Sequence, residues 1–140
     1  MIINAGGRTD LVHFYSPWLL ERFKKGFVYV RNPLYPETVT RYDLTPSVVD
    51  CVTFCSKNYA PILPRLEEIT SKFNTYFFYT ITAYSKDIEP LVPDIDTSID
   101  TLLKLERRVG KERIAGRYDP VFVTKKYALS VHEITFSHMA

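Results

Sequence analysis

The chain has 140 residues, of which 46% are hydrophobic and 24% are charged, a composition typical of one ordinary globular domain with a sizeable core. Its 18 basic and 16 acidic residues leave a net charge of +2, which gives no sign of a surface for duplex nucleic acid or acidic membranes. No apolar run is long enough to span a membrane, and the first residues lack the pattern of a secretory signal. We therefore expect a single domain, residues 1–140, located in the cytoplasm.

Predicted strands and helices alternate along the chain. Short runs of apolar and β-branched residues predict core strands, and the segments between them carry one apolar side and predict helices. The expected core strands are residues 1–5, 51–55, 75–84 and 114–118. The expected helices run from Ser16 to Gly26, through Leu66 to Phe73, from Asp96 or Thr97 to Gly110, and over residues 128–140.

One pair of runs departs from this alternation. Residues 27–31 and 38–44 alternate in polarity on either side of a loop that contains Pro33 and Pro36, which predicts an inserted antiparallel hairpin. The remaining strand–helix units predict a parallel sheet with right-handed crossovers. The predicted fold is therefore α/β: a partial TIM-barrel-like (β/α)4 parallel sheet with an inserted β-hairpin. A small open sheet covered on both faces fits the same pattern.

Each predicted core strand ends in a group of polar residues. In parallel α/β folds the carboxyl ends of the strands are where ligands bind, so we expect these groups to form one site. Guanidinium and ammonium groups suit an anionic ligand, amide and hydroxyl groups add hydrogen bonds, and carboxylates suit proton transfer. The candidate ligand-binding residues are Arg8, Thr9, Lys57, Asn58, Tyr84 and Arg117, and the candidate catalytic residues are Asp10 and Asp119.

A purely structural interpretation uses the same residues. The charged side chains would then form one network of ion pairs around the strand ends, with no ligand. Buried charges have to be paired in either case, so the presence of opposite charges does not separate the two interpretations. The network would consist of Arg8, Asp10, Lys57, Arg117 and Asp119.

The cysteines and histidines do not predict a metal site. Cys51 and Cys55 lie four residues apart on a predicted strand, roughly 13 Å from each other, which is too far for a disulfide. We expect two buried, unbridged thiols. The three histidines lack the i,i+4 spacing of a helical metal pair, and His13 is the one that could act as a general acid or base.

Several segments together resemble the bacterial family described as domain of unknown function 1848. They are Arg8-Thr9-Asp10, Val30-Arg31-Asn32-Pro33, Lys57-Asn58, the run of Thr80, Thr82 and Tyr84, Lys86-Asp87-Ile88-Glu89-Pro90, Gly110-Lys111-Glu112-Arg113 and Arg117-Tyr118-Asp119-Pro120. Family members are longer, and their C-terminal part carries a cysteine cluster similar to the iron–sulfur ligands of radical S-adenosylmethionine enzymes. The resemblance is to an N-terminal half only, and it implies no cofactor within this chain.

Two functions follow from these observations. In the first, the chain is the N-terminal half of a barrel enzyme whose strand ends bind an anionic small molecule or a nucleotide. In the second, it is a truncated, non-enzymatic binding or assembly module, in which two copies close one barrel as a homodimer because a half barrel exposes two sheet edges and an open interior. The residues are compatible with both.

Overall fold

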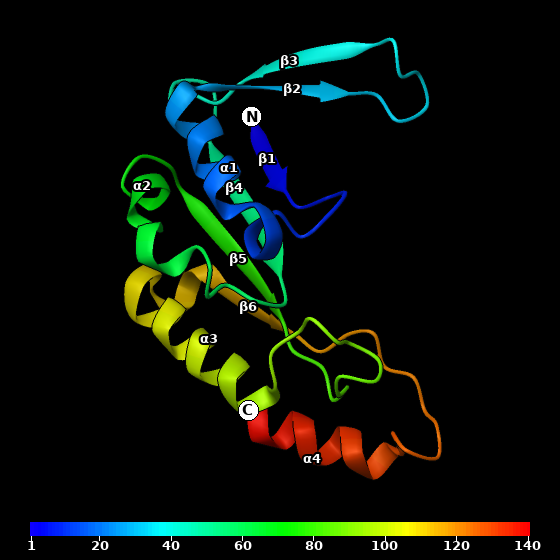
Figure 1. The fold of residues 1–140 in the computed structure, drawn as a ribbon. Helices are drawn as coiled ribbons and strands as arrows, with labels where there is room; N and C mark the ends of the chain where they lie inside the picture. Colours follow the sequence, from blue (N-terminus) through cyan, green and yellow to red (C-terminus); the bar gives the residue numbers. More distant parts are fainter.

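A four-stranded parallel sheet forms the centre of the fold (Figure 1), in a computed structural model that describes residues 1–140. Strands β1 (Ile2–Ala5), β4 (Cys51–Ser56), β5 (Thr75–Thr80) and β6 (Ile114–Arg117) lie side by side in that order. Every neighbouring pair is parallel. This arrangement confirms the predicted parallel series. The sheet is open, with β1 and β6 at its edges, so it does not form a closed barrel.

The predicted hairpin is confirmed as a separate two-stranded sheet. Strands β2 (Phe27–Arg31) and β3 (Val39–Asp43) are antiparallel, with Phe27 opposite Asp43 and Arg31 opposite Val39. The side chain of Asn32 stabilises the turn because its Oδ1 accepts the backbone N–H of Leu34 at 2.9 Å. Figure 1 shows the hairpin projecting away from the parallel sheet at the top of the molecule.

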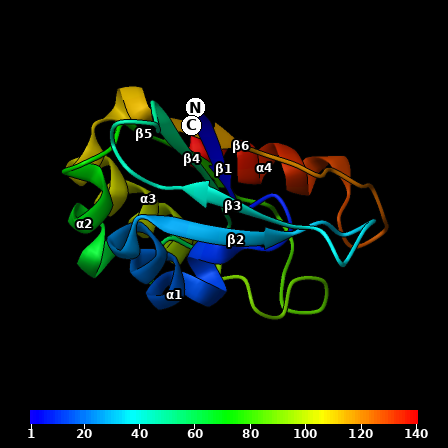
Figure 2. The same ribbon diagram turned by 90° about the horizontal axis from the view of Figure 1, so that it is seen from above.

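The helices that follow the first three core strands lie on one side of the sheet. They are α1 (Leu11–Lys25), α2 (Glu67–Thr70), which the 3-10 turn Leu63–Arg65 precedes, and α3 (Ile95–Val109). Parallel strands joined in sequential order by right-handed crossovers place their connections on the same face, and Figure 2 shows these three helices together. A second 3-10 turn, Lys111–Arg113, precedes β6, and α4 (Leu129–Met139) lies beyond the carboxyl ends of the strands (Figure 1).

The two faces of the parallel sheet differ in burial. Side chains that face the helices form the core and are fully or almost fully buried: Ala5, Val52, Phe54, Phe77 and Tyr79. The alternate side chains point to the other face. There Cys55, Tyr76 and Phe78 are only half-buried, and Ile2 is 70% exposed. Parallel sheets are normally covered on both faces, so this sheet has one uncovered face.

Helix α1 begins at Leu11 rather than at the predicted Ser16. Its N-cap is Asp10, whose Oδ1 accepts the backbone N–H of His13 at 2.8 Å. Within the helix, Tyr15 has non-helical dihedral angles (φ −133°, ψ 24°). Ser16 and the following proline, which resemble a helix start, therefore mark a kink inside α1. The proline lacks the backbone N–H that would donate a hydrogen bond there.

The predicted end of α1 at Gly26 is confirmed. Gly26 adopts the left-handed conformation, with φ at 75°, and its N–H bonds to the carbonyl groups of Arg22 and Phe23. Glycine adopts this conformation without the steric cost that a Cβ atom brings. The turn at Gly26 leads directly into β2.

Strand β5 ends at Thr80, whereas the sequence predicts a strand to Tyr84. The neighbouring strands stop at the same level, since Ser56 pairs with Tyr79 and Thr80 pairs with Arg117. The last backbone bond of this ladder runs from the Ile81 N–H to the Arg117 carbonyl at 3.0 Å, and β5 ends there. The predicted strand over residues 75–84 is therefore too long, and Thr82 and Tyr84 lie in the segment that follows β5.

The other helices differ from prediction mainly at their ends. Helix α3 has Asp94 as its N-cap rather than Asp96 or Thr97, with the backbone N–H of Thr97 donating to Asp94 Oδ1 at 2.8 Å. The predicted helix through Leu66 to Phe73 is short, because only Glu67–Thr70 is α-helical. The final helix is confirmed by α4.

Candidate functional site

One cavity lies at the carboxyl ends of the four parallel strands. It has a volume of about 510 Å³, and glycines 6 and 7 and Thr80 contribute to its wall. Six of the eight predicted site residues line it: Arg8, Thr9, Asp10, Lys57, Arg117 and Asp119. By the register of the strands, Cys55, Thr80 and Arg117 point to the uncovered face of the sheet. The cavity is thus at the rim of that face.

Asp10 connects α1 to the end of β4. Besides capping the helix, its carboxylate accepts the Ser56 hydroxyl at 2.8 Å and the Lys57 backbone N–H at 3.2 Å, both on Oδ2. Both oxygens of Asp10 therefore have protein donors. Asp10 thus joins the first turn of α1 to the end of β4, a link that the sequence did not reveal because no local pattern relates Asp10 to Ser56.

Arg8 is the cation of the cavity that has no carboxylate partner. Its side chain is exposed, and Nη1 donates to the backbone carbonyl of Arg31 at 2.8 Å. The loop that carries Arg8 passes close to β4 at Gly6. A Cβ atom at this position would lie only 3.3 Å from the Cys55 carbonyl oxygen, so glycine allows the close approach. The φ of Gly6, 150°, is also one that side chains rarely allow. Arg8 thus adds an uncompensated positive charge to the cavity.

Lys57 forms an ion pair with Glu89, a residue that the sequence analysis did not assign to the site. Its Nζ contacts Glu89 Oε1, and the Thr82 hydroxyl donates to Glu89 Oε2 at 2.5 Å. The side chains of Lys57 and Glu89 are 25% and 15% exposed, so water screens the pair only partly. The loop that follows β5 therefore folds back onto the end of β4.

Arg117 contacts both a carboxylate and a thiol. Nη2 donates to Asp119 Oδ2 at 2.6 Å, and Nη1 donates to Cys55 Sγ at 3.2 Å. The hydrogen bond to Asp119 raises the pKa of the Arg117 guanidinium above its usual value. The side chains of Arg117 and Asp119 are 41% and 50% exposed, so this pair is open to solvent and to a ligand.

Asn58 and Tyr84 lie outside the cavity lining. Asn58 Oδ1 accepts the Ala60 backbone N–H at 3.0 Å and stabilises the turn after β4. The Tyr84 hydroxyl donates to the Pro120 carbonyl at 2.8 Å and accepts the Phe122 N–H at 2.9 Å. Its ring stacks on Phe122 and contacts Tyr127 and His132. Tyr84 thus belongs to an aromatic cluster that anchors the segment after β6.

The cysteines and histidines form no metal centre among these residues. Cys51 and Cys55 are free, as predicted, but both are half-buried rather than buried. His13 stacks on the ring of Phe14, with 4.2 Å between centroids. No group of three or more His, Cys, Asp and Glu side chains is placed to hold a metal ion. None of the helices combines the length and the apolar character that crossing a membrane requires.

Comparison with known proteins places the chain in a family. A family model described as "Domain of unknown function (DUF1848)" matches residues 2–140. The chain belongs to this family. No curated protein matches it, and no solved structure matches it. Three of the segments that carry the family resemblance, around Arg8, Lys57 and Arg117, meet at the cavity described above.

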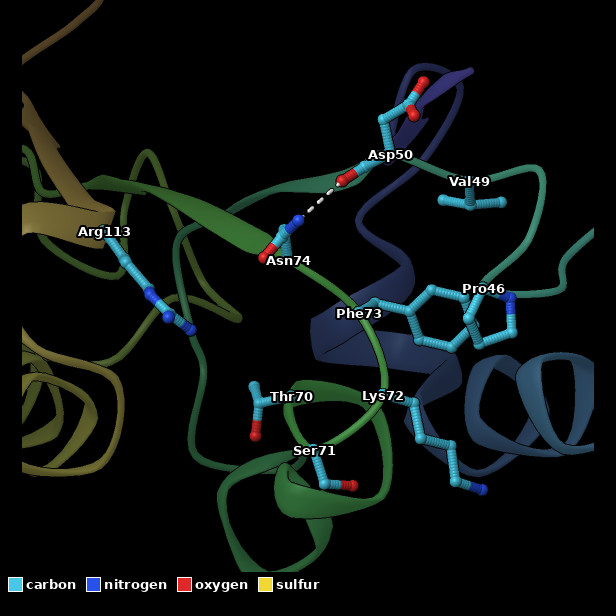
Figure 3. Close-up of a pocket in the computed structure, with 9 residues that line it drawn as sticks. All are labelled: Pro46, Val49, Asp50, Thr70, Ser71, Lys72, Phe73, Asn74 and Arg113. Atoms are coloured by element: carbon cyan, nitrogen blue, oxygen red, sulfur yellow. Dashed lines mark hydrogen bonds between the residues drawn. The ribbon is translucent and has the colours of Figure 1, made fainter.

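A second polar cavity lies at the opposite, amino-terminal ends of the strands (Figure 3). It has a volume of about 410 Å³, and the Asn74 side chain donates to the Asp50 carbonyl at 3.1 Å across it. Two basic residues line it, but Figure 3 shows Arg113 extending into the cavity while Lys72 points away. Because these cations do not converge, the cavity at the carboxyl ends is the better candidate for an anion site.

Proposed function

We propose that this chain binds a small phosphate-bearing molecule at the carboxyl ends of its parallel sheet. The observation that carries the proposal is the convergence of Arg8, Lys57 and Arg117, from three separate segments, on one cavity. Guanidinium groups bind phosphate oxygens through paired hydrogen bonds, and an ammonium group adds a point charge. A volume of about 510 Å³ falls within the range of small-molecule sites.

The three cations differ in how readily they would bind a phosphate. Arg8 has no acidic partner, so its charge is available. Arg117 is paired with Asp119 at an exposed position. Exposed ion pairs contribute little free energy, so a phosphate can displace Asp119 at small cost. Lys57 is held by the more buried Glu89, and a ligand would have to displace that carboxylate. We therefore assign the largest contribution to Arg8, followed by Arg117.

If the site also catalyses a reaction, Asp119 is the better candidate for proton transfer. Asp119 is half-exposed, and the structure gives only its Oδ2 a side-chain partner. The carboxylate of Asp10 already accepts three hydrogen bonds, so we assign it to positioning. The order of the strands supports a barrel-type site as well, because the first strands of a (β/α)8 barrel follow the same sequential order.

Calorimetric titration at low ionic strength tests this proposal. We expect AMP and inorganic phosphate to bind wild-type protein and adenosine, which lacks the phosphate, to show no binding. Arg8→Gln should weaken AMP binding by roughly tenfold or more, the value of one charge-assisted hydrogen bond. Glu89→Gln should strengthen it, because Lys57 then loses its partner.

Arg107→Gln provides the matched control. Arg107 is an exposed arginine of α3 that does not line this cavity, so its substitution changes the net charge equally without touching the site. Binding of AMP that is unaffected by Arg8→Gln, or equally weakened by Arg107→Gln, contradicts the proposal. So does the absence of binding by both AMP and phosphate to correctly folded protein.

A second candidate function is assembly with another copy of the chain. The observation in its favour is the uncovered sheet face, where Tyr76 and Phe78 are half-buried and Ile2 is exposed. Two parallel four-stranded sheets related by a two-fold axis along the strands would enclose these side chains in one interior. The strand ends of both copies would then share one rim.

A further inference from the structure

An apolar cavity lies between β1, α1 and the hairpin, away from the site described above. It has a volume of about 360 Å³, and twelve of its fourteen lining residues are hydrophobic. The lining includes Ile3, Trp18, Phe23, Val28 and Leu44. None of its residues lines the cavity at the strand ends. Mostly apolar cavities of this size, with few polar groups, are the usual form of small-molecule sites.

A single charged side chain lines this cavity. Arg22 is half-buried, and its Nε atom is buried without a hydrogen-bond partner. Its guanidinium carbon lies 5.9 Å from the centre of the Trp18 ring. The neighbouring Glu21 pairs with Lys25 at 3.5 Å instead, and no aspartate or glutamate lines the cavity. Arg22 is therefore a partly desolvated cation without a counter-ion, which is unfavourable for an isolated protein.

We propose that this cavity binds a small apolar carboxylic acid, with the aliphatic or aromatic part among the hydrophobic side chains and the carboxylate on Arg22. The guanidinium fork matches the two oxygens of a carboxylate. Such a ligand supplies the missing negative charge and covers apolar surface that is open to water. The charge distinguishes this ligand from a neutral apolar molecule, and the mostly hydrophobic lining of the cavity distinguishes it from a phosphate.

Trp18 makes the proposal directly measurable. It is the only tryptophan of the chain and lines the cavity, so its fluorescence reports on occupancy. We expect octanoate, below its micelle-forming concentration, to give a saturable fluorescence change. Octan-1-ol, which has the same chain length and no charge, should bind at least tenfold more weakly because it lacks the charge-assisted hydrogen bonds.

Substitution of Arg22 tests the role of the charge. Arg22→Met should remove the preference for octanoate over octan-1-ol while leaving the alcohol bound. Lys24→Met, an exposed residue of the same helix that does not line the cavity, is the matched control and should keep the preference. Addition of inorganic phosphate should not displace octanoate, because the two sites share no residue.

Three results would overturn the proposal. One is equal binding of octan-1-ol and octanoate by wild-type protein, a comparison that needs no variant. Another is an unchanged preference in a folded Arg22→Met protein. The third is the absence of a saturable fluorescence change with octanoate in correctly folded wild-type protein that light scattering shows to be monomeric, where the cavity is open to the ligand.

Discussion

Tyr79 carries a hydroxyl group that has no hydrogen-bond partner in the core. Its side chain is fully buried, and burial raises the pKa of Tyr79 from its ordinary value of 10.0 to about 12. The folded protein therefore retains this proton at pH values where the unfolded chain has lost it. The resulting contribution to stability is complete below pH 10 and is lost as the pH rises toward 12.

We expect Tyr79→Phe to flatten the alkaline loss of stability. At pH 7 the free energy of unfolding of the variant should lie within about 1 kcal/mol of the wild-type value, because the removed hydroxyl has no hydrogen-bond partner. Between pH 10 and 12 the wild type should lose up to about 3 kcal/mol through this residue, and the variant should not. Urea unfolding at pH 7, 10 and 11 measures the difference.

Tyr76→Phe serves as the control for that experiment. Tyr76 lies on the same strand but is half-buried on the uncovered face, so its substitution should leave the alkaline loss in place. A cost well above 1 kcal/mol for Tyr79→Phe at pH 7 would show that its hydroxyl is bonded in solution.

At the residue scale, six of the eight predicted site residues line one cavity, whereas Asn58 and Tyr84 lie outside it. How the charged residues pair was not predicted. Arg8, Lys57 and Arg117 could be placed together because each lies at or just after the end of a predicted strand, and parallel strands end at one edge. The ion pair of Lys57 with Glu89 could not, since 32 residues and an irregular loop separate the two. Local sequence patterns indicate where a residue lies along a helix or strand, but they do not predict contacts between loops.

At the scale of elements, Asp10 does more than cap a helix, because it also links helix α1 to strand β4. Its carboxylate closes the first turn of α1 and holds the end of β4. We expect Asp10→Ala to destabilise the protein by about 2 kcal/mol or more, the upper range for a lost helix cap, because the contacts to Ser56 and Lys57 disappear with it. Urea unfolding at pH 7 measures this cost.

Asp94→Ala provides a comparison within the same chain. Asp94 caps α3 through the Thr97 N–H but is exposed and has no bond to another strand, so we expect a loss of about 1 kcal/mol. Equal costs for the two variants would contradict the linking role of Asp10.

Element types were easier to predict than their ends. The hairpin followed from its alternating polarity, and α3 followed from its apolar side and the closing Gly110. The start of α1 was missed because Ser16 and Pro17 resemble a helix start, whereas they follow the non-helical Tyr15 in the middle of the helix. The strand predicted over residues 75–84 was too long for a different reason. The length of β5 is set by where β4 and β6 stop, and a sequence pattern does not contain that information.

At the scale of the whole molecule, the uncovered sheet face leads to a prediction about assembly. If a second copy covers it, light scattering during size-exclusion chromatography should give twice the chain mass of 16.3 kDa at high concentration. Phe78→Asp places a charge on that face and should shift the protein to monomer without unfolding it. Phe136→Asp, at an aromatic residue of α4 that is 56% exposed, should not.

A monomeric mass at every concentration would contradict the assembly function and leave the phosphate site unaffected.

The predicted parallel order is confirmed, but the barrel-like shape is not, because four strands fix the direction of a sheet and not its closure. Whether an open sheet closes depends on what pairs with β1 and β6, and those partners are not encoded in the strands themselves.

The triple hydrogen bonding of Asp10 also affects how quickly a ligand would bind. The loop from Gly6 to Asp10 is fastened at its end to both α1 and β4 before any ligand arrives. Binding then requires no ordering of this loop, so its conformational entropy is lost during folding rather than during association. We expect a rapid, single-step encounter governed by charge, in which dissociation rather than association distinguishes strong ligands from weak ones.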